Sequence, residues 1–165
     1  MELILIRHGK AEERSEKAKD AKRDLSADGK KKLLKTMPSL GLLIKNPGKA
    51  QIWTSQLDRA TQSADVISKL FNIQEVEHFD FISDGNFSAL TDALAKMKPS
   101  STVIVVGHEP FLGNWTKQLC GQTLPFKKGA VSGIKINKFD PLTAELLWFY
   151  QPQALGRLGE NNIKK

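Results

Sequence analysis

The chain has 165 residues, 40% of them hydrophobic and 26% charged, with a formal net charge of +7 at pH 7. These values predict one globular domain over residues 1–165 and exclude a disordered or fibrous chain. A single cysteine excludes an internal disulfide framework and a multi-cysteine zinc site. No apolar stretch is long enough to span a membrane and the start lacks a signal peptide, so we expect a cytoplasmic protein without a membrane partner.

The first predicted strand, residues 3–6, consists of four consecutive aliphatic residues, as in a strand buried on both faces of a parallel sheet. It leads directly into Arg7, His8 and Gly9. In open parallel sheets the functional crevice lies beyond the carboxyl ends of the strands, which places Arg7 and His8 at this crevice. A guanidinium binds phosphate oxygens and a neutral imidazole can attack phosphorus, so the pair suits phosphate chemistry.

A charged segment, residues 10–25, follows this strand and is expected to form a mobile loop on the rim of the crevice. Ser26 then caps a helix that Pro38 interrupts. The apolar residues of its expected inner face are Leu33, Leu34 and Met37. A second helical piece is predicted over residues 40–45, before a turn signal.

The next predicted unit is a short strand over residues 51–54 and a helix that begins near Leu57, with Ser55 as its expected cap. Apolar residues recur at helical spacing along this helix. Arg59 lies in its first turn, where unpaired backbone amides and the helix dipole favour an anion.

A strand over residues 75–79 and a helix that starts near residue 87 come next. They precede the most apolar strand of the chain, residues 102–106. His108 follows at the tip of this strand, and Pro110 is expected to be the first residue of the next helix.

The pattern changes after residue 121. Residues 134–136 alternate apolar and polar side chains, and residues 145–150 form a second strand after a turn, which predicts a hairpin at the edge of the sheet. Residues 151–165 contain Gly, Asn and Lys and are expected to be a loose tail.

Three strand ends thus carry side chains suited to phosphate: Arg7 with His8, then Arg59, then His108. Because the carboxyl ends of parallel strands lie at one edge of a sheet, we expect these side chains to meet in one pocket. The order of elements predicts an α/β fold of three layers, in which helices flank a mostly parallel central sheet.

These segments match three hallmark regions of a known family. Residues 7–9, 54–64 and 107–110 resemble, in order, the motifs of the histidine phosphatase superfamily, which includes cofactor-dependent phosphoglycerate mutase and the acid phosphatases. The resemblance covers residues 2 to about 120 and implies a phosphoglycerate mutase-like α/β/α fold. The short length and the sequences of residues 5–11 and 107–113 are similar to those of the SixA-type phosphohistidine phosphatases.

The resemblance implies a two-step phosphoryl transfer without metal or cofactor. His8 attacks phosphorus, and water hydrolyses the resulting phosphohistidine enzyme. The residues implied to hold the three equatorial oxygens are Arg7, Arg59 and His108. Arg23, on the rim before the Ser26 helix, is a further candidate for a phosphate or substrate contact.

The proton donor is where this sequence departs from the family. Many relatives carry a glutamate after the third strand, whereas Asp80 and Asp84 are the nearest carboxylates here. Alignment favours Asp80 as the possible proton donor, and Glu109 beside His108 is another carboxylate near the site. Proton donation matters less for phosphohistidine, because imidazole is a better leaving group than an alcohol.

The short segment between Arg59 and His108 leaves no room for the long lid of larger relatives. An open pocket with a basic rim predicts a phosphohistidine on a protein as the substrate, and hence a role in signalling. A small phosphate ester is the alternative. A mutase is least favoured, because it needs a closed site that protects the phosphoenzyme from water.

Two other classes of function, nucleic-acid binding and metal binding, fit the sequence less well. A nucleic-acid-binding domain would use the lysines at residues 30–32, but residues 10–35 contain no aromatic side chain to interleave with them, so we expect no nucleic-acid partner. A metal site on His8 and His108 would lack an acidic motif at ligand spacing, so we expect no metal. The sequence leaves the oligomeric state open.

Overall fold

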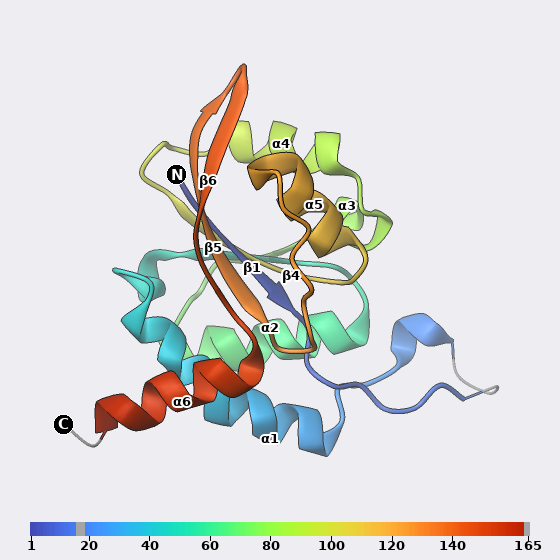
Figure 1. Cartoon of the computed structure of the whole chain (residues 1–165). Helices are drawn as coiled ribbons and strands as arrows, with labels where there is room; N and C mark the ends of the chain where they lie inside the picture. Colours follow the sequence, from blue (N-terminus) through green and yellow to red (C-terminus); the bar gives the residue numbers. More distant parts are fainter. Residues whose placement is uncertain (16–18, 164–165) are drawn as a thin grey trace.

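A computed structural model describes residues 1–15 and 19–163 of the chain. Its strands are β1 (Glu2–Arg7), β2 (Gln51–Thr54), β3 (Val76–His78), β4 (Thr102–Gly107), β5 (Val131–Phe139) and β6 (Leu142–Tyr150). They form one six-stranded sheet in the order β3-β2-β4-β1-β5-β6 (Figure 1). The strands β1 to β4 are parallel, whereas β5 pairs antiparallel with β1 and with β6. The predicted mostly parallel sheet with a hairpin at its edge is confirmed.

Helices cover both faces of the sheet, which gives the three predicted layers (Figure 1). They are α1 (Ala27–Thr36), α2 (Asp58–Phe71), α3 (Asp80–Asp84), α4 (Phe87–Ala95), α5 (Phe111–Cys120) and α6 (Pro152–Ile163), with the 3-10 helices η1 (Asp20–Lys22), η2 (Met37–Leu42) and η3 (Pro47–Lys49). One apolar core lies between the sheet and the layer of α1, η2, α2 and α6. The other lies between the sheet and the layer of α3, α4 and α5.

The aliphatic run of β1 supplies both cores in alternation. Ile4 and Ile6 belong to the core on the α1 side, and Leu3 and Leu5 to the core on the α5 side. All four side chains are fully buried. Since successive side chains of a strand point to opposite faces, a strand covered on both faces needs no polar residue in its run.

The register of the central strands brings the two histidine motifs together. β1 and β4 are neighbours, aligned so that Arg7 pairs with Gly107. His8 and His108 are the residues that follow these two strands, so they lie side by side at the same edge of the sheet. β2 lies on the other side of β4 and ends at this edge, where Ser55 follows.

The α1 region agrees with the sequence at its start and departs from it further on. Ser26 caps α1, because its Oγ accepts a hydrogen bond from the Gly29 amide at 2.9 Å. The expectation that Leu34 faces the core was wrong, since its side chain is 47% exposed. The helical piece predicted over residues 40–45 is the 3-10 helix η2, which includes Pro38 and begins directly after α1.

The predicted loop over residues 10–25 contains η1 and is closed at its base by a bridge between Ala11 and Leu25. Residues 16–18 of that prediction lie outside the described residues. The closed base holds both ends of the segment against the end of β1.

The loose tail predicted over residues 151–165 was wrong, because its described part is mainly α6. Leu155 is fully buried in the core on the α1 side, and Figure 1 shows α6 lying along α1. A Cβ atom at Gly159 would lie 2.6 Å from the Ser39 Oγ, so this glycine permits the close approach of α6 to η2. Residues 164 and 165 lie outside the described residues.

Candidate active site

His8 follows β1 directly and is buried, with 4% of its surface exposed. Its Nδ1 lies 2.7 Å from the Gly9 carbonyl oxygen. A carbonyl only accepts hydrogen bonds, so Nδ1 carries the proton and the Nε2 lone pair is free. The Gly9 amide is itself held by the Ser63 Oγ at 3.0 Å, which fixes the turn after β1 onto α2. His8 is thus presented as an oriented, neutral imidazole.

His108 follows β4 and is also buried, with its ring centroid 5.1 Å from that of His8. Its Nε2 lies 2.6 Å from the Ser55 Oγ. Ser55 was expected to cap the helix after β2, but α2 begins at Asp58 and the serine hydroxyl instead contacts this histidine and the Leu57 amide. A hydroxyl that donates to Nε2 leaves Nδ1 of His108 protonated and available to a ligand.

Both histidines are neutral at physiological pH. Burial is the main cause that lowers the pKa of His8 to about 3, and the nearby His108, Arg59 and Arg7 lower it further. Burial lowers the pKa of His108 to about 4, again assisted by Arg59 and Arg7. Two neutral imidazoles beside two guanidinium groups make a site that attracts an anion.

Arg7 ends β1 and is held by the segment that precedes β5. Its Nη1 donates to the Phe126 carbonyl at 2.8 Å, and its backbone pairs with Gly129 and Ala130. Burial lowers the pKa of this guanidinium, and Glu109 partly offsets that effect. An arginine remains charged at neutral pH even so, and the backbone contacts fix its direction.

Arg59 lies in the first turn of α2, and its contacts link it to η1. Its Nη1 donates to the Asp20 carbonyl at 3.0 Å, and its Nη2 donates to the Asp20 carboxylate at 3.3 Å. The same carboxylate lies 3.6 Å from Nε of Arg23 and of Arg14. The structure therefore places Arg23 next to Arg59, around a carboxylate that both share.

Four polar atoms of the predicted site residues are buried without a hydrogen-bond partner in the described part of the chain. They are Nε of Arg7, Arg23 and Arg59 and Nδ1 of His108. Nε of Arg23 still lies 3.6 Å from the Asp20 carboxylate. A buried polar group without a hydrogen bond costs about 1–3 kcal/mol, so the other three atoms mark a place where a ligand is expected. All four can donate a hydrogen bond, and an oxyanion such as a phosphoryl group supplies acceptors.

The structure places the two candidate carboxylates differently. Asp80 is exposed and begins α3, a short helix that sequence reasoning did not foresee, just beyond the carboxyl end of β3. Glu109 is half-buried, and its Oε1 accepts from the Gly113 amide at 2.8 Å in the first turn of α5. Burial raises the pKa of Glu109, while that hydrogen bond and Arg7 lower it. Pro110 is the cap of α5 rather than its first residue.

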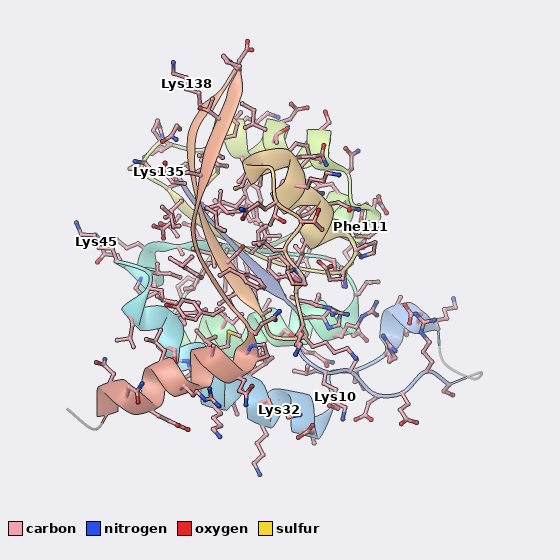
Figure 2. The ribbon with its side chains drawn as sticks, viewed as in Figure 1. Lys10, Lys32, Lys45, Phe111, Lys135 and Lys138 are labelled. Atoms are coloured by element: carbon pink, nitrogen blue, oxygen red, sulfur yellow. The ribbon has the colours of Figure 1, made fainter. Side chains whose placement is uncertain are left out.

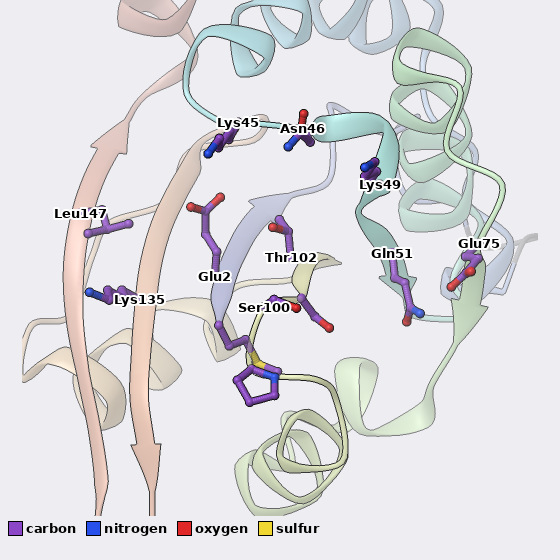
Figure 3. A pocket seen from close by; sticks show the side chains of 13 residues that line it. Glu2, Lys45, Asn46, Lys49, Gln51, Glu75, Ser100, Thr102, Lys135 and Leu147 are labelled. Carbon is purple, nitrogen blue, oxygen red and sulfur yellow. The ribbon is translucent and has the colours of Figure 1, made fainter.

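Two cavities lie at opposite ends of the sheet. The larger, about 460 Å³, is at the amino ends of β1, β2 and β4 and is lined by charges of both signs, including Glu2, Glu75 and Lys45 (Figure 3). The second, about 410 Å³, has Arg7 and Gly9 in its wall. Parallel sheets bind ligands at their carboxyl ends, so the second cavity adjoins the candidate site.

Sequence reasoning missed three polar side chains of this region. Asp20 and Lys128 come from the segments before α1 and β5, and Ser55 was assigned only a capping role. None of them belongs to a periodic pattern that indicates a position near the site. The only sequence feature that could have indicated such a position is the negative charge of Asp20 within a mostly basic segment.

Residues 3–93, more than half of the chain, match the model of the histidine phosphatase superfamily (branch 1). The chain belongs to the histidine phosphatase superfamily. An uncharacterised protein of Picosynechococcus sp. (strain PCC 7002) is 30% identical over 145 residues, with 82% of this chain and 85% of that protein covered. The family predicted from the motifs is confirmed.

Solved structures of similar fold include phosphatases of different kinds. The protein histidine phosphatase SixA complexed with tungstate matches with a TM-score of 0.80 at 20% identity, over 94% of this chain and 99% of that chain. A mycobacterial glucosyl-3-phosphoglycerate phosphatase with inorganic phosphate gives 0.68 at 14%, over 92% and 98%. The Entamoeba histolytica phosphoserine phosphatase with 3-phosphoglyceric acid gives 0.66 at 15%, over 93% and 98%. These likenesses confirm the phosphoglycerate mutase-like fold.

Two further observations concern residues 1–15 and 19–163. None of their helices combines the length and the apolar character that crossing a bilayer requires. Within the same residues, histidine, cysteine, aspartate and glutamate side chains do not gather in threes as a metal site needs.

Proposed function

We propose that the chain is a metal-independent phosphatase that removes the phosphoryl group from phosphohistidine on a protein, through a phosphohistidine intermediate on His8. The observation that carries the proposal is the pairing of a free His8 Nε2 with buried donors that lack partners. Superfamily membership supports the phosphatase class of this activity. The cytoplasmic location and the signalling role expected from the sequence belong to the same proposal.

In the first proposed step His8 Nε2 attacks phosphorus, and the bond from phosphorus to the substrate nitrogen breaks. The residues proposed to bind the three phosphoryl oxygens are Arg7, Arg59 and His108, with Arg23 beside them. The Gly9 carbonyl keeps the proton on His8 Nδ1, and it stabilises the charge that the ring acquires on phosphorylation. In the second step water attacks phosphorus, which restores the neutral ring and releases inorganic phosphate.

Two features favour a phosphohistidine substrate on a protein. The connection from α2 to β4 contains only β3 and two short helices, α3 and α4, and these pack on the sheet rather than over the pocket. An open pocket admits a side chain carried on a protein surface. The likeness to a SixA protein histidine phosphatase supports the same choice through the fold.

A small-molecule phosphomonoesterase is the second candidate. The likeness to glucosyl-3-phosphoglycerate phosphatase and phosphoserine phosphatase favours it, because both are named for small phosphate esters. The two candidates share the pocket and differ in the leaving group.

The deciding experiment measures phosphate release, in the presence of a chelator, from a histidine-phosphorylated protein and from an aryl phosphate. The variant is His8→Ala, and the matched control is His78→Ala, which removes an exposed histidine on β3. We expect release by the wild type and the control, a preference for the phosphoprotein, and no release by His8→Ala. Full activity in His8→Ala contradicts the mechanism, and a preference for the ester favours the second candidate.

The proton donor is tested by comparing leaving groups. We expect Asp80→Asn to slow hydrolysis of an alkyl phosphate about a hundredfold or more and to affect phosphohistidine far less, because general acid catalysis contributes about 10²–10⁴-fold when the leaving group is poor. Glu109→Gln is the comparison, since its carboxylate is already engaged with the Gly113 amide. A larger loss in Glu109→Gln than in Asp80→Asn on the alkyl ester transfers the role to Glu109.

A further inference from the structure

The cavity of about 410 Å³ beside Arg7 belongs to no step of the proposed reaction. It lies between the end of β1, the helix α1 and the segment before β5. Its apolar lining includes Leu33 and Pro152, and the glycines Gly9, Gly29 and Gly129 also line it. A volume of this size falls in the range of ligand pockets, about 300–1,000 Å³, and is larger than one phosphoryl group needs.

Lysines surround this apolar lining. They are Lys10, Lys32, Lys127 and Lys128. Lys10 and Lys32 share Asp28, at 3.6 and 3.1 Å from its carboxylate. Across the described ranges no ion pair to a carboxylate joins Lys127 or Lys128. With Arg7, five positive charges therefore line the cavity, and Asp28 is the carboxylate paired with two of them, an imbalance that an anionic ligand relieves.

Lys128 lines the cavity together with Arg7. Burial lowers the pKa of its ammonium group, and the charges of Arg7, Arg23 and Lys10 lower it further. The segment that carries Lys128 is fixed by hydrogen bonds from Arg7 to Phe126 and from Gly129 to Arg7. A group bound at Lys128 is thus held next to the arginine proposed to bind the phosphoryl group.

We propose that this cavity binds an acidic side chain of the protein substrate, a glutamate or aspartate close to the phosphohistidine. The inference rests on the proposed function and adds a determinant of substrate choice to it. The lysines bind the carboxylate, and the lining of Leu33 and Pro152 packs against the aliphatic stem. The mixed-charge cavity at the other end of the sheet has neither this excess of positive charge nor a place near the phosphate (Figure 3).

The test uses phosphohistidine peptides of one neutral sequence in which a single glutamate is moved through each position near the phosphohistidine. We expect at least one position to raise kcat/KM about two- to fivefold over the peptide without glutamate, the range of an exposed ion pair. This gain shrinks at high salt, because salt screens exposed charges. A matching series with lysine in place of glutamate is measured in parallel.

The decisive variant is Lys128→Glu, and Lys138→Glu is its control. Lys138 lies near the tip of the β5–β6 hairpin, far from Lys10 and Lys32 (Figure 2), and its substitution makes the same change in net charge. We expect Lys128→Glu to reverse the preference toward the lysine peptide, Lys128→Gln to abolish it, and Lys138→Glu to keep the wild-type profile. Because each result is a ratio of two peptides on one enzyme, a change in the amount of folded protein cancels.

Three outcomes overturn the inference. The first is wild-type hydrolysis of all peptides without any preference for glutamate. The second is an equal effect of Lys128→Glu and Lys138→Glu. The third is an effect of Lys128→Glu confined to a small bisphosphate, which assigns the cavity to a second phosphate. If the wild type hydrolyses an aryl phosphate but none of the phosphohistidine peptides, the proposed function itself fails, and the inference fails with it.

Discussion

Lowering the pH from 7 to 5 is expected to leave His8, the proposed nucleophile, in its neutral form. An ordinary histidine, with a pKa of about 6.5, is only about 3% neutral at pH 5 and loses roughly thirtyfold of its nucleophilic form. With its pKa lowered to about 3, mainly by burial, His8 stays neutral over this whole range. His108, lowered to about 4, also stays largely neutral. The fall expected of an exposed histidine is therefore absent.

Proton NMR of the histidine rings measures this directly. The chain has three histidines, so His78→Asn leaves only the signals of His8 and His108. We expect neither signal to show a midpoint between pH 5 and 8. Inorganic phosphate should raise both midpoints, because a bound anion stabilises the imidazolium form. A midpoint near 6.5 for His8 without phosphate refutes the reasoning, as does a thirtyfold fall in kcat/KM with a substrate that does not titrate in this range.

The same shifts make the fold sensitive to acid. Both folded pKa values lie below the unfolded value, so the unfolded state binds more protons as the pH falls below 6.5. The stability contributed by the neutral rings is fully present above about pH 6.5. It is lost as the pH falls toward about 4 for His108 and about 3 for His8. Each histidine contributes a slope of at most about 1.4 kcal/mol per pH unit to the free energy of unfolding.

Three substitutions test other parts of the structure. Arg59→Ala should lower kcat about a hundredfold or more, as loss of one oxyanion donor typically does; a loss below tenfold in a turnover assay contradicts its proposed role. Asp20→Asn should lower the inhibition constant of inorganic phosphate about three- to tenfold, because a carboxylate no longer competes for Arg59; weaker inhibition means that Asp20 chiefly positions the arginine. Leu155→Ala should lower the free energy of unfolding in urea by about 2–5 kcal/mol. The half-buried Leu158→Ala should cost less, and equal losses contradict the docking of α6.

The part of the site that follows strand ends was predictable from the sequence. His8 and His108 each come one residue after an apolar run that is too short for a membrane and lacks polar positions. Such a run indicates a central strand, and a central strand in a parallel sheet fixes the edge at which the next residue appears. The alignment of Arg7 with Gly107 then follows from two strands that end at the same edge.

The part that depends on packing between distant segments was not predictable. Gly156 and Gly159 indicate a tail when the sequence is taken alone, because glycine weakens a helix. In the structure Gly159 allows α6 to approach Ser39, so the residue that argued against a helix is the one that lets it dock. The positions of Asp20 and Lys128 likewise depend on segments that meet only in the folded chain.

The proposed chemistry and the proposed choice of substrate depend on different parts of the fold. His8 and His108 follow the two central strands of the sheet, where opening requires nearly complete unfolding. The lysines of the side cavity and the arginines around Asp20 lie mostly on connecting segments, which tolerate exchange of residues and changes of length. Related proteins can therefore differ in substrate through changes in these segments, while the two histidines keep their positions. A scaffold of this kind separates what evolution must preserve from what it is free to vary.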